Sequence, residues 1–223
     1  MKIQNLIGFC IALTVLAGCR TDPPRILKLR DDLIEDGKTT MKEVVKHLGL
    51  PALRQRERNG VTAAHYMDAA GEFNAEGKRM HGFSAEPGTM RFKTMSILSG
   101  KDGVITAHWE YQSSQAIKGR SLEGGPRLRF GPVLDPSAVG QIKHRVTGEK
   151  DLVSWFGVPA LEFMAPDRTL IFVWIEGTLA SSISSKNSYR ALSVALDDRG
   201  AESQHSVMET DELGEAMRGL ILR

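Results

Sequence analysis

The chain has 223 residues, of which 29 are Lys or Arg and 27 are Asp or Glu, giving a net charge of +2. This near balance gives no indication of nucleic-acid binding, which is typical of strongly basic proteins. The length is sufficient for one large domain or two small domains, each with a hydrophobic core.

The N-terminal segment has the pattern of an export signal. Lys2 provides a positive start, an apolar run follows from Leu6 to Leu16, and Ala17 and Gly18 are the small residues that precede a cleavage site. The apolar run is too short to cross a membrane, which takes a helix of roughly 20 residues. We therefore expect residues 1–18 to be a signal peptide.

The residues around the predicted cleavage site resemble the lipobox of bacterial lipoproteins. Leu16 to Cys19 reads Leu-Ala-Gly-Cys, and the resemblance implies cleavage after Gly18 and a diacylglycerol thioether on Cys19. An ordinary signal peptide that happens to contain a cysteine is the alternative. Arg20 stands where lipoproteins retained in the inner membrane typically have Asp. The resemblance therefore implies a lipid anchor in the outer membrane, facing the periplasm.

Export restricts the chemistry that the mature chain can use. The other cysteine, Cys10, lies in the segment that is removed, so the mature chain has no thiol pair and depends on its hydrophobic core. Export also removes ATP and nicotinamide cofactors from the plausible ligands and argues further against nucleic acid. We expect no cofactor, and we expect the membrane to be the first partner, through the lipid on Cys19.

Two segments of the chain are similar to each other. Residues 34–51 align with residues 142–159 without a gap, at an offset of 108 (142 minus 34), and the Gly-x-Pro at 49–51 falls on the one at 157–159. Such self-similarity indicates an internal duplication.

A short amphipathic helix is predicted before each Gly-x-Pro. Thr40 and Glu43 have the spacing of a capping box, while Thr147 can cap the helix of the second copy. Gly49 can adopt the left-handed conformation that ends the first of these helices, and the following proline prevents continuation. An additional helix is predicted before each of them, from Pro24 to Asp36 and from Pro136 to Arg145.

After each Gly-x-Pro the hydrophobic pattern changes to that of strands. The first strands are predicted from Val61 to Asp68 and from Thr169 to Gly177, and two further strands follow in each copy. Asp102-Gly103 is a strong signal for a hairpin turn, because glycine accepts a positive φ without steric cost. The first copy has a longer loop from Ala70 to Gly88, and a closing helix is predicted from Asp211 to Leu222.

Together these patterns predict an α+β fold of two tandem helix-helix-strand-strand-strand units, each with an antiparallel sheet packed on two short helices. The segment between the copies is rich in Gly, Pro and Arg and is interpreted as a linker. The expected parts are a signal peptide (1–18), a lipidated tether (19–24), a first unit (25–118), a linker (119–135) and a second unit (136–223).

The repeated unit resembles the SmpA/OmlA (BamE-like) domain. The residues that carry the resemblance are Gly37, Thr39 or Thr40, Val44, Leu48, Gly49, Pro51, Trp109 and Tyr111 in the first copy, and Thr147, Leu152, Phe156, Gly157, Pro159, Trp174, Asp197 and Gly200 in the second. The second copy departs from the pattern, because Arg145 replaces the glycine. The tandem arrangement is also similar to that of the β-lactamase-inhibitory proteins. Either resemblance implies a binding role and no catalytic chemistry.

No catalytic or metal-binding motif is present in the sequence. The six histidines do not form the His-x₃-His spacing of a zinc site, and there is no Gly-x-Ser-x-Gly elbow, Ser-x-x-Lys pair or phosphate-binding loop. We therefore expect no catalytic residue, no metal and no enzyme activity.

The aromatic residues are the best candidates for a binding surface. Alternation places Ile105, Ala107, Trp109 and Tyr111 on one strand face, expected to be core against the helices. The strand from Thr169 to Ile175 is apolar on both faces, so the face that does not meet the helices needs another cover. The first unit's sheet, the linker or a partner can provide it. Central burial and a protein-binding face that includes Phe172 and Trp174 are the alternatives.

These features predict an outer-membrane lipoprotein that acts as a non-enzymatic protein-binding or scaffold factor in envelope or outer-membrane protein assembly. The alternative is an inhibitor or sequestering module that binds a periplasmic enzyme through its sheet face. A hydrolase with an unrecognised site is a third hypothesis.

Overall fold

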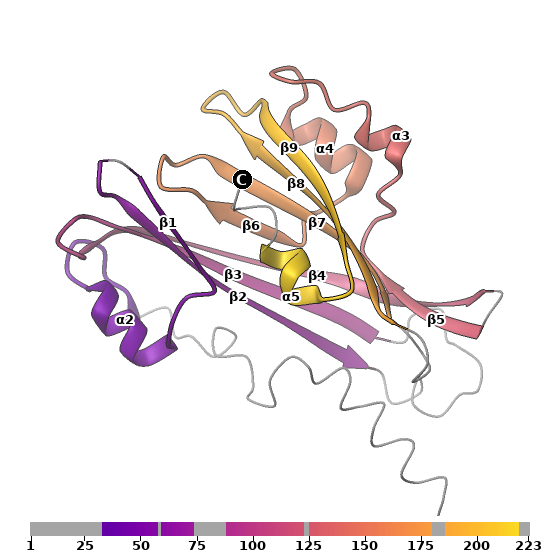
Figure 1. Ribbon diagram of the computed structural model, residues 1–223, viewed down its shortest axis with the longest axis horizontal. Coiled ribbons are helices and arrows are strands. Elements are labelled where there is room, and N and C mark those ends of the chain that lie inside the picture. Colours follow the sequence, from indigo (N-terminus) through magenta and orange to yellow (C-terminus); the bar gives the residue numbers. More distant parts are fainter. Residues whose placement is uncertain (1–32, 58, 74–87, 123–124, 180–185, 219–223) are drawn as a thin grey trace, which may run out of the picture.

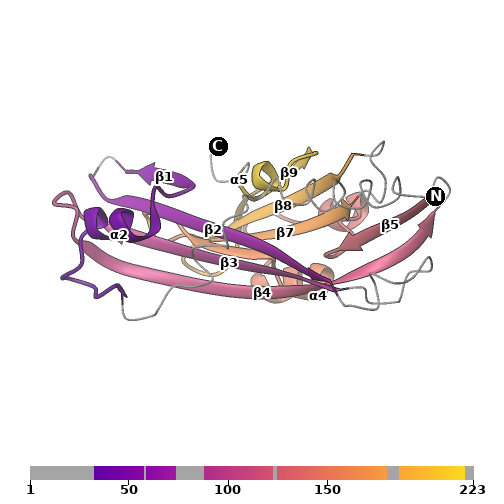
Figure 2. The same ribbon diagram turned by 90° about the horizontal axis from the view of Figure 1, so that it is seen from below.

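The computed structural model describes residues 33–57, 59–73, 88–122, 125–179 and 186–218, and its main feature is one nine-stranded antiparallel sheet (Figure 1). The strands follow the order β1-β2-β3-β4-β5-β7-β8-β9, with β6 paired to β7. Seen from below, the long strands curve along the molecule (Figure 2). The strands are β1 (Leu53–Arg56), β2 (Thr62–Phe73), β3 (Gly88–Ser99), β4 (Ile105–Leu122), β5 (Gly125–Phe130), β6 (Leu161–Met164), β7 (Leu170–Leu179), β8 (Ser188–Leu196) and β9 (Glu202–Thr210).

The described helices are few and short: α2 (Met41–Leu48), α3 (Pro136–Val139), α4 (Glu149–Phe156) and α5 (Leu213–Arg218). The predicted capping box of α2 is confirmed, since the backbone N–H of Thr40 donates to Glu43 Oε2 at 2.8 Å and that of Glu43 donates to Thr40 Oγ1 at 3.4 Å. In α4 the N-cap is Gly148 and not Thr147, and the Gly148 N–H donates to Asp151 Oδ2 at 3.0 Å.

The same local contacts recur at the offset of 108. Gly49 and Gly157 end α2 and α4 with φ of 81° and 72°. The Tyr66 hydroxyl donates to the carbonyl of Gly49 at 3.0 Å, and the indole Nε1 of Trp174 donates to the carbonyl of Gly157 at 2.8 Å. An aromatic residue in the second strand of each half therefore holds the end of the preceding helix.

The predicted fold class of two separate α+β units is wrong. β4 pairs with β3 up to Ile117 and then with β5 from Lys118 to Leu122, and β5 pairs with β7. Strands therefore occupy most of the segment 119–135 that was expected to be a linker, and they join both halves into one sheet. The pairing of β4 with β5 is a local hairpin, whereas the pairing of β5 with β7 joins segments that are far apart in the sequence. Such long-range pairing leaves no local periodic signal in a segment rich in Gly and Pro.

The element count of each half also differs from the prediction. Each half has an extra short strand after its Gly-x-Pro, β1 or β6, and the helix predicted from Pro136 to Arg145 reduces to the single turn of α3. Most of the helix predicted over 24–36 lies outside the described residues, and the described part, 33–36, is not α-helical. The strands predicted at 61–68 and 169–177, the hairpin turn at Asp102-Gly103 and the closing helix are confirmed, the last as α5.

Three groups of buried side chains form the core. One lies under α2 and one under α4. The largest belongs to both halves: it joins Met90 and Phe92 of β3 to Phe163 of β6 and Val173 of β7, and Met217 of α5 also contributes to it. Because the two halves share this core, they bury apolar surface that neither could bury alone.

The edge of β6 that faces away from β7 is bonded by side chains of the first half. Thr94 Oγ1 donates to the carbonyl of Glu162 at 2.7 Å, Ser113 Oγ donates to that of Ala160 at 2.7 Å, and Ser96 Oγ accepts from the Met164 N–H at 3.0 Å. β6 thus packs against the face of β3 and β4, and its backbone groups are satisfied without a strand neighbour on that side.

Candidate protein-binding surface

The predicted anchor lies outside the described residues. This applies to the signal peptide (1–18), to Cys19 and to the tether (19–24). Among the helices of the described residues, none is long and apolar enough to span a membrane.

Phe172 and Trp174 lie in the core. They are 4% and 0% exposed and pack with Phe156 of α4, with ring centroids 6.0 Å apart between Phe172 and Trp174 and 5.9 Å apart between Trp174 and Phe156. The opposite face of β7, with Val173 at its centre, contributes to the core shared with the first half. The structure thus shows central burial, with the first half as the cover of the second face.

Trp109 and Tyr111 lie on the face of β4 opposite to the one predicted. The register of β3 and β4 shifts between Leu98 and Ser99, so that Ser99 pairs with Ile105 and Leu98 with Ala107. This bulge inserts one residue and reverses the alternation. Ile105 therefore packs under α2, as predicted, while Trp109 and Tyr111 face β6.

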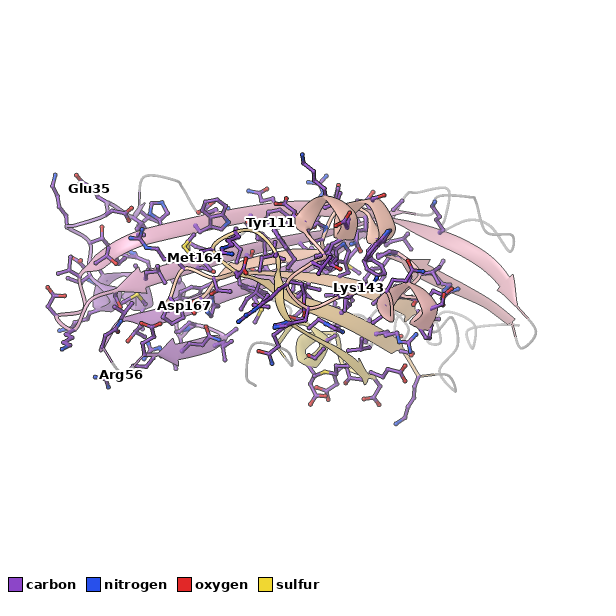
Figure 3. The ribbon with its side chains drawn as sticks, turned by 90° about the horizontal axis from the view of Figure 1, so that it is seen from above. Glu35, Arg56, Tyr111, Lys143, Met164 and Asp167 are labelled. Carbon is purple, nitrogen blue, oxygen red and sulfur yellow. The ribbon has the colours of Figure 1, made fainter. Side chains whose placement is uncertain are left out.

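Trp109 is the exposed member of this face, with 40% of its surface accessible. Its indole lies beside the carboxylate of Glu162 in β6. The hydroxyl of Tyr111 donates to the carbonyl of Pro159 at 2.8 Å, at the junction labelled by Tyr111 and Met164 in Figure 3. The two aromatic rings thus join β4 to the start of the second half.

Glu162 places a nearly buried acidic group beside the exposed tryptophan. Burial raises the pKa of the Glu162 carboxyl, the neighbouring Trp109 indole lowers it in part, and the charge of Glu149 in α4 raises it further. Neither Glu162 nor its contact with Trp109 was predicted from the sequence, because a four-residue strand such as β6 carries too short a pattern to assign its faces.

The outer edge of β4 is the longest strand edge beside this cluster. The edge is paired at its start, where the Ile105 N–H donates to the carbonyl of Thr39 at 2.9 Å and its carbonyl accepts from Gly37 at 2.7 Å. It is paired again at its end, from Lys118 to Leu122, by β5. Between these points, over residues 106–117, no strand of the described residues pairs with it (Figure 2).

Gly131 explains why β5 does not continue along β4. Its φ is +80°, and a Cβ at this position would lie 1.8 Å from the carbonyl oxygen of Ile175. The chain therefore turns away from β4 at Gly131, and only glycine permits this close approach of two backbones. We refer to Trp109, Tyr111, Glu162 and the edge of residues 106–117 as the β4 surface.

The histidines form contacts that the sequence did not predict. His108 Nδ1 lies 2.8 Å from Asp36 Oδ1, while the buried carboxylate of Glu202 lies between His205, at 2.8 Å, and His144, at 3.4 Å. Within the described part of the chain, no group of three or more His, Cys, Asp or Glu side chains is arranged to hold a metal ion.

Two shallow hollows of the described surface lie beside α2, and Thr39, which lines the larger one, accepts the Ile105 N–H at the start of the β4 edge. The larger has a volume of about 280 Å³ and is lined by Leu33, Lys38, Thr39, Glu43 and His47.

Neither family models, nor curated proteins, nor solved structures give a match to this chain.

Proposed function

We propose that this protein is an outer-membrane lipoprotein, anchored by a lipid on Cys19 and facing the periplasm. We propose that it is not an enzyme and that it binds another envelope protein, as a scaffold or accessory factor in envelope or outer-membrane protein assembly. The lipobox from Leu16 to Cys19 supports the anchor. The β4 surface supports the binding role.

The exposed ring of Trp109 is the observation that carries the binding role. Tryptophan is strongly enriched among the residues that dominate binding energy at protein interfaces. Here a tryptophan is 40% exposed in the middle of a long strand, beside Glu162 and next to an edge with which no strand of the described residues pairs. A ring positioned in this way offers apolar area that a partner can cover at little cost in side-chain entropy.

The anchor is tested by replacing Cys19 with Ser in the full chain. We expect Cys19→Ser to lose incorporation of radioactive palmitate and to leave the outer-membrane fraction, because serine lacks the thiol that forms the thioether. Cys10→Ser is the matched control, since it removes the only other cysteine and should keep the label. A Cys19→Ser protein that is still labelled and still fractionates with the outer membrane would contradict the anchor.

The binding role is tested by mild cross-linking in intact cells, followed by affinity isolation of the full chain. We expect Trp109→Ala to reduce the recovery of the main partner at least tenfold. Trp155→Ala in α4 should leave recovery unchanged, because this ring has nearly the same exposure (39%) but does not belong to the β4 surface. Equal losses in both variants, or no partner for the unmodified protein, would contradict the proposal.

The identity of the partner separates the proposed role from its competitors. Components of envelope or outer-membrane protein assembly support the scaffold role, whereas a single soluble periplasmic enzyme supports an inhibitor or sequestering module. Turnover of a substrate without any partner would support a hydrolase and overturn the non-enzymatic role.

A further inference from the structure

We propose that the outer edge of β4, over residues 106–117, binds an extended segment of the partner protein as an additional strand of the sheet, with an apolar side chain against Trp109. This inference rests on the proposed function and specifies how the partner is bound. Addition of a strand to an open sheet edge is an established mode of peptide recognition, in which the backbone provides affinity and side-chain contacts provide specificity.

We refer to the outer edge of β4 over residues 106–117, with which no strand of the described residues pairs, as the gap. The gap can accommodate one extended strand. It is bounded by the backbone pairing of Ile105 with Gly37 and Thr39 at one end, and by β5 at the other. At about 3.3 Å per residue, the stretch from 106 to 117 is roughly 40 Å long. Only an extended chain can supply backbone donors and acceptors along the whole of this length.

Beyond the bulge at its start, this edge lacks the features that usually prevent strand addition. Residues 106–117 contain no Pro, Lys or Arg, and their one acidic residue, Glu110, is held by Lys93 Nζ at 3.2 Å. Natural sheet edges are normally protected by such charges, by proline, by bulges or by short length. β1, at one end of the sheet, has only four residues and carries Arg54 and Arg56.

The two sides of the gap define the chemistry of the bound segment. Trp109 and Tyr111 lie on the side of β6, while His108, Glu110 and Gln112 lie on the other face of the strand. We infer a segment in which apolar residues, facing the aromatic rings, alternate with polar residues that face solvent.

A second copy of this chain fits the gap less well than a partner segment does. In an antiparallel pairing over 106–117, the turn before Ile105 of one copy would occupy the place that β5 holds beside Lys118 of the other. The segments that bound the gap thus obstruct a symmetric pairing over its full length. A segment without such flanking structure meets no obstruction.

Site-specific photo-cross-linking in intact cells tests the inference. A benzoylphenylalanine is placed in the full chain at Gln112 or Ser114, which are exposed beside the gap, or at Lys118, which is exposed on the same strand but paired to β5. We expect adducts at 112 and 114 that map to positions about two residues apart in one partner segment, and at least tenfold less adduct at 118.

Three results would overturn the inference. These are adducts of equal yield at all three positions, adducts that map to scattered sites of a folded partner surface, and adducts to a second copy of this chain. If the Trp109-dependent partner is recovered but no adduct forms at 112 or 114, strand addition is wrong while the binding role stands. If no partner is recovered at all, the proposed function itself is wrong.

An edge-charging variant provides an independent measurement. The double substitution Gln112→Lys and Ser114→Lys introduces the kind of charges that protect natural edges, at exposed positions where the fold should be unaffected. We expect it to reduce cross-linked partner at least tenfold. Gln204→Lys, in the edge strand β9, is the control and should have no effect. Unchanged recovery with the double variant would contradict strand addition.

Discussion

His65 shows how a single polar residue depends on the contact between the two halves. Its side chain is completely buried, with Nδ1 3.0 Å from Ser96 Oγ and Nε2 3.2 Å from Gln55 Oε1. The ring of Phe163 packs edge-on against it with centroids 5.5 Å apart. Ser96 also accepts the backbone N–H of Met164, so the histidine supports the hydroxyl on which β6 rests.

Acidification should therefore weaken the fold through His65. Burial lowers the pKa of His65 from 6.5 to about 4, so the folded protein keeps the ring neutral where the unfolded chain binds a proton. The contribution of neutral His65 to the free energy of unfolding is fully present above about pH 6.5. It is lost as the pH decreases towards 4, by about 3 kcal/mol in total. Denaturant unfolding at pH 7.5, 5.5 and 4.5 measures this loss.

His65→Gln is the control for this prediction. Glutamine keeps hydrogen-bonding capacity but has no proton to gain in this range, so the variant should be less stable at pH 7.5 and show a smaller decrease on acidification. The same pH dependence in both proteins would assign the acid sensitivity to other groups.

At the level of elements, the bulge at the start of β4 and the turn at the end of β5 create the β4 surface. The bulge turns Trp109 towards β6 and away from α2, while Gly131 directs the chain off the edge of β4. Gly177 allows the matching approach from the other side, because a Cβ there would lie 2.2 Å from the ring of Phe130. The two glycines thus let β5 and β7 join the halves of the sheet.

Gly131→Ala should be far more destabilising than Gly103→Ala. Both glycines have a φ of +80°, but a Cβ on Gly103 meets no atom within 4 Å, whereas one on Gly131 collides with the Ile175 carbonyl. We expect about 1–2 kcal/mol from backbone strain alone for Gly103→Ala. For Gly131→Ala we expect more than about 4 kcal/mol, because the backbones of β5 and β7 must separate.

Equilibrium unfolding of both variants in urea measures the difference. The difference between the two variants gives the loss of unfolding free energy that is caused by the steric clash, since the conformational cost of the positive φ is common to both positions. Similar losses of stability in the two variants would show that the junction of β5 and β7 can adapt to a side chain.

At the level of the whole molecule, the core between the halves makes them one folding unit. Phe163, from the second half, is fully buried among residues of the first, and the side chains of β3 and β4 bond the edge of β6. The contact of Trp109 with Glu162 also exists only while the halves are docked. The proposed binding surface therefore depends on the complete fold.

Unfolding should accordingly be a single cooperative transition. Phe163→Ala should cost about 3–5 kcal/mol and lower amide protection equally in β2–β3 and in β7–β8, as measured by hydrogen exchange. Val153→Ala, at a partly exposed position of α4, should cost less than about 1 kcal/mol and serves as the control. Loss of protection confined to β7–β8 would show that the halves unfold independently.

The local features of this protein follow from its amino-acid sequence. The capping box at Thr40, the helix end at Gly49, the main strands and the similarity of the two halves could all be predicted, because they depend on residues a few positions apart. The export signal and the lipobox are also complete within a short segment, and they remain predictions from the sequence.

The way in which the two halves are joined, and the burial of the aromatic residues in the strands, depend on tertiary contacts. The pairing of β5 with β7 links distant segments, and the bulge in β4 reverses the face of Trp109 by inserting one residue. Hydrophobic alternation reports that a strand has an apolar face but not what covers it. Phe172 and Trp174 are therefore core under α4, and Trp109 is exposed on β4, because register and long-range packing assign the faces.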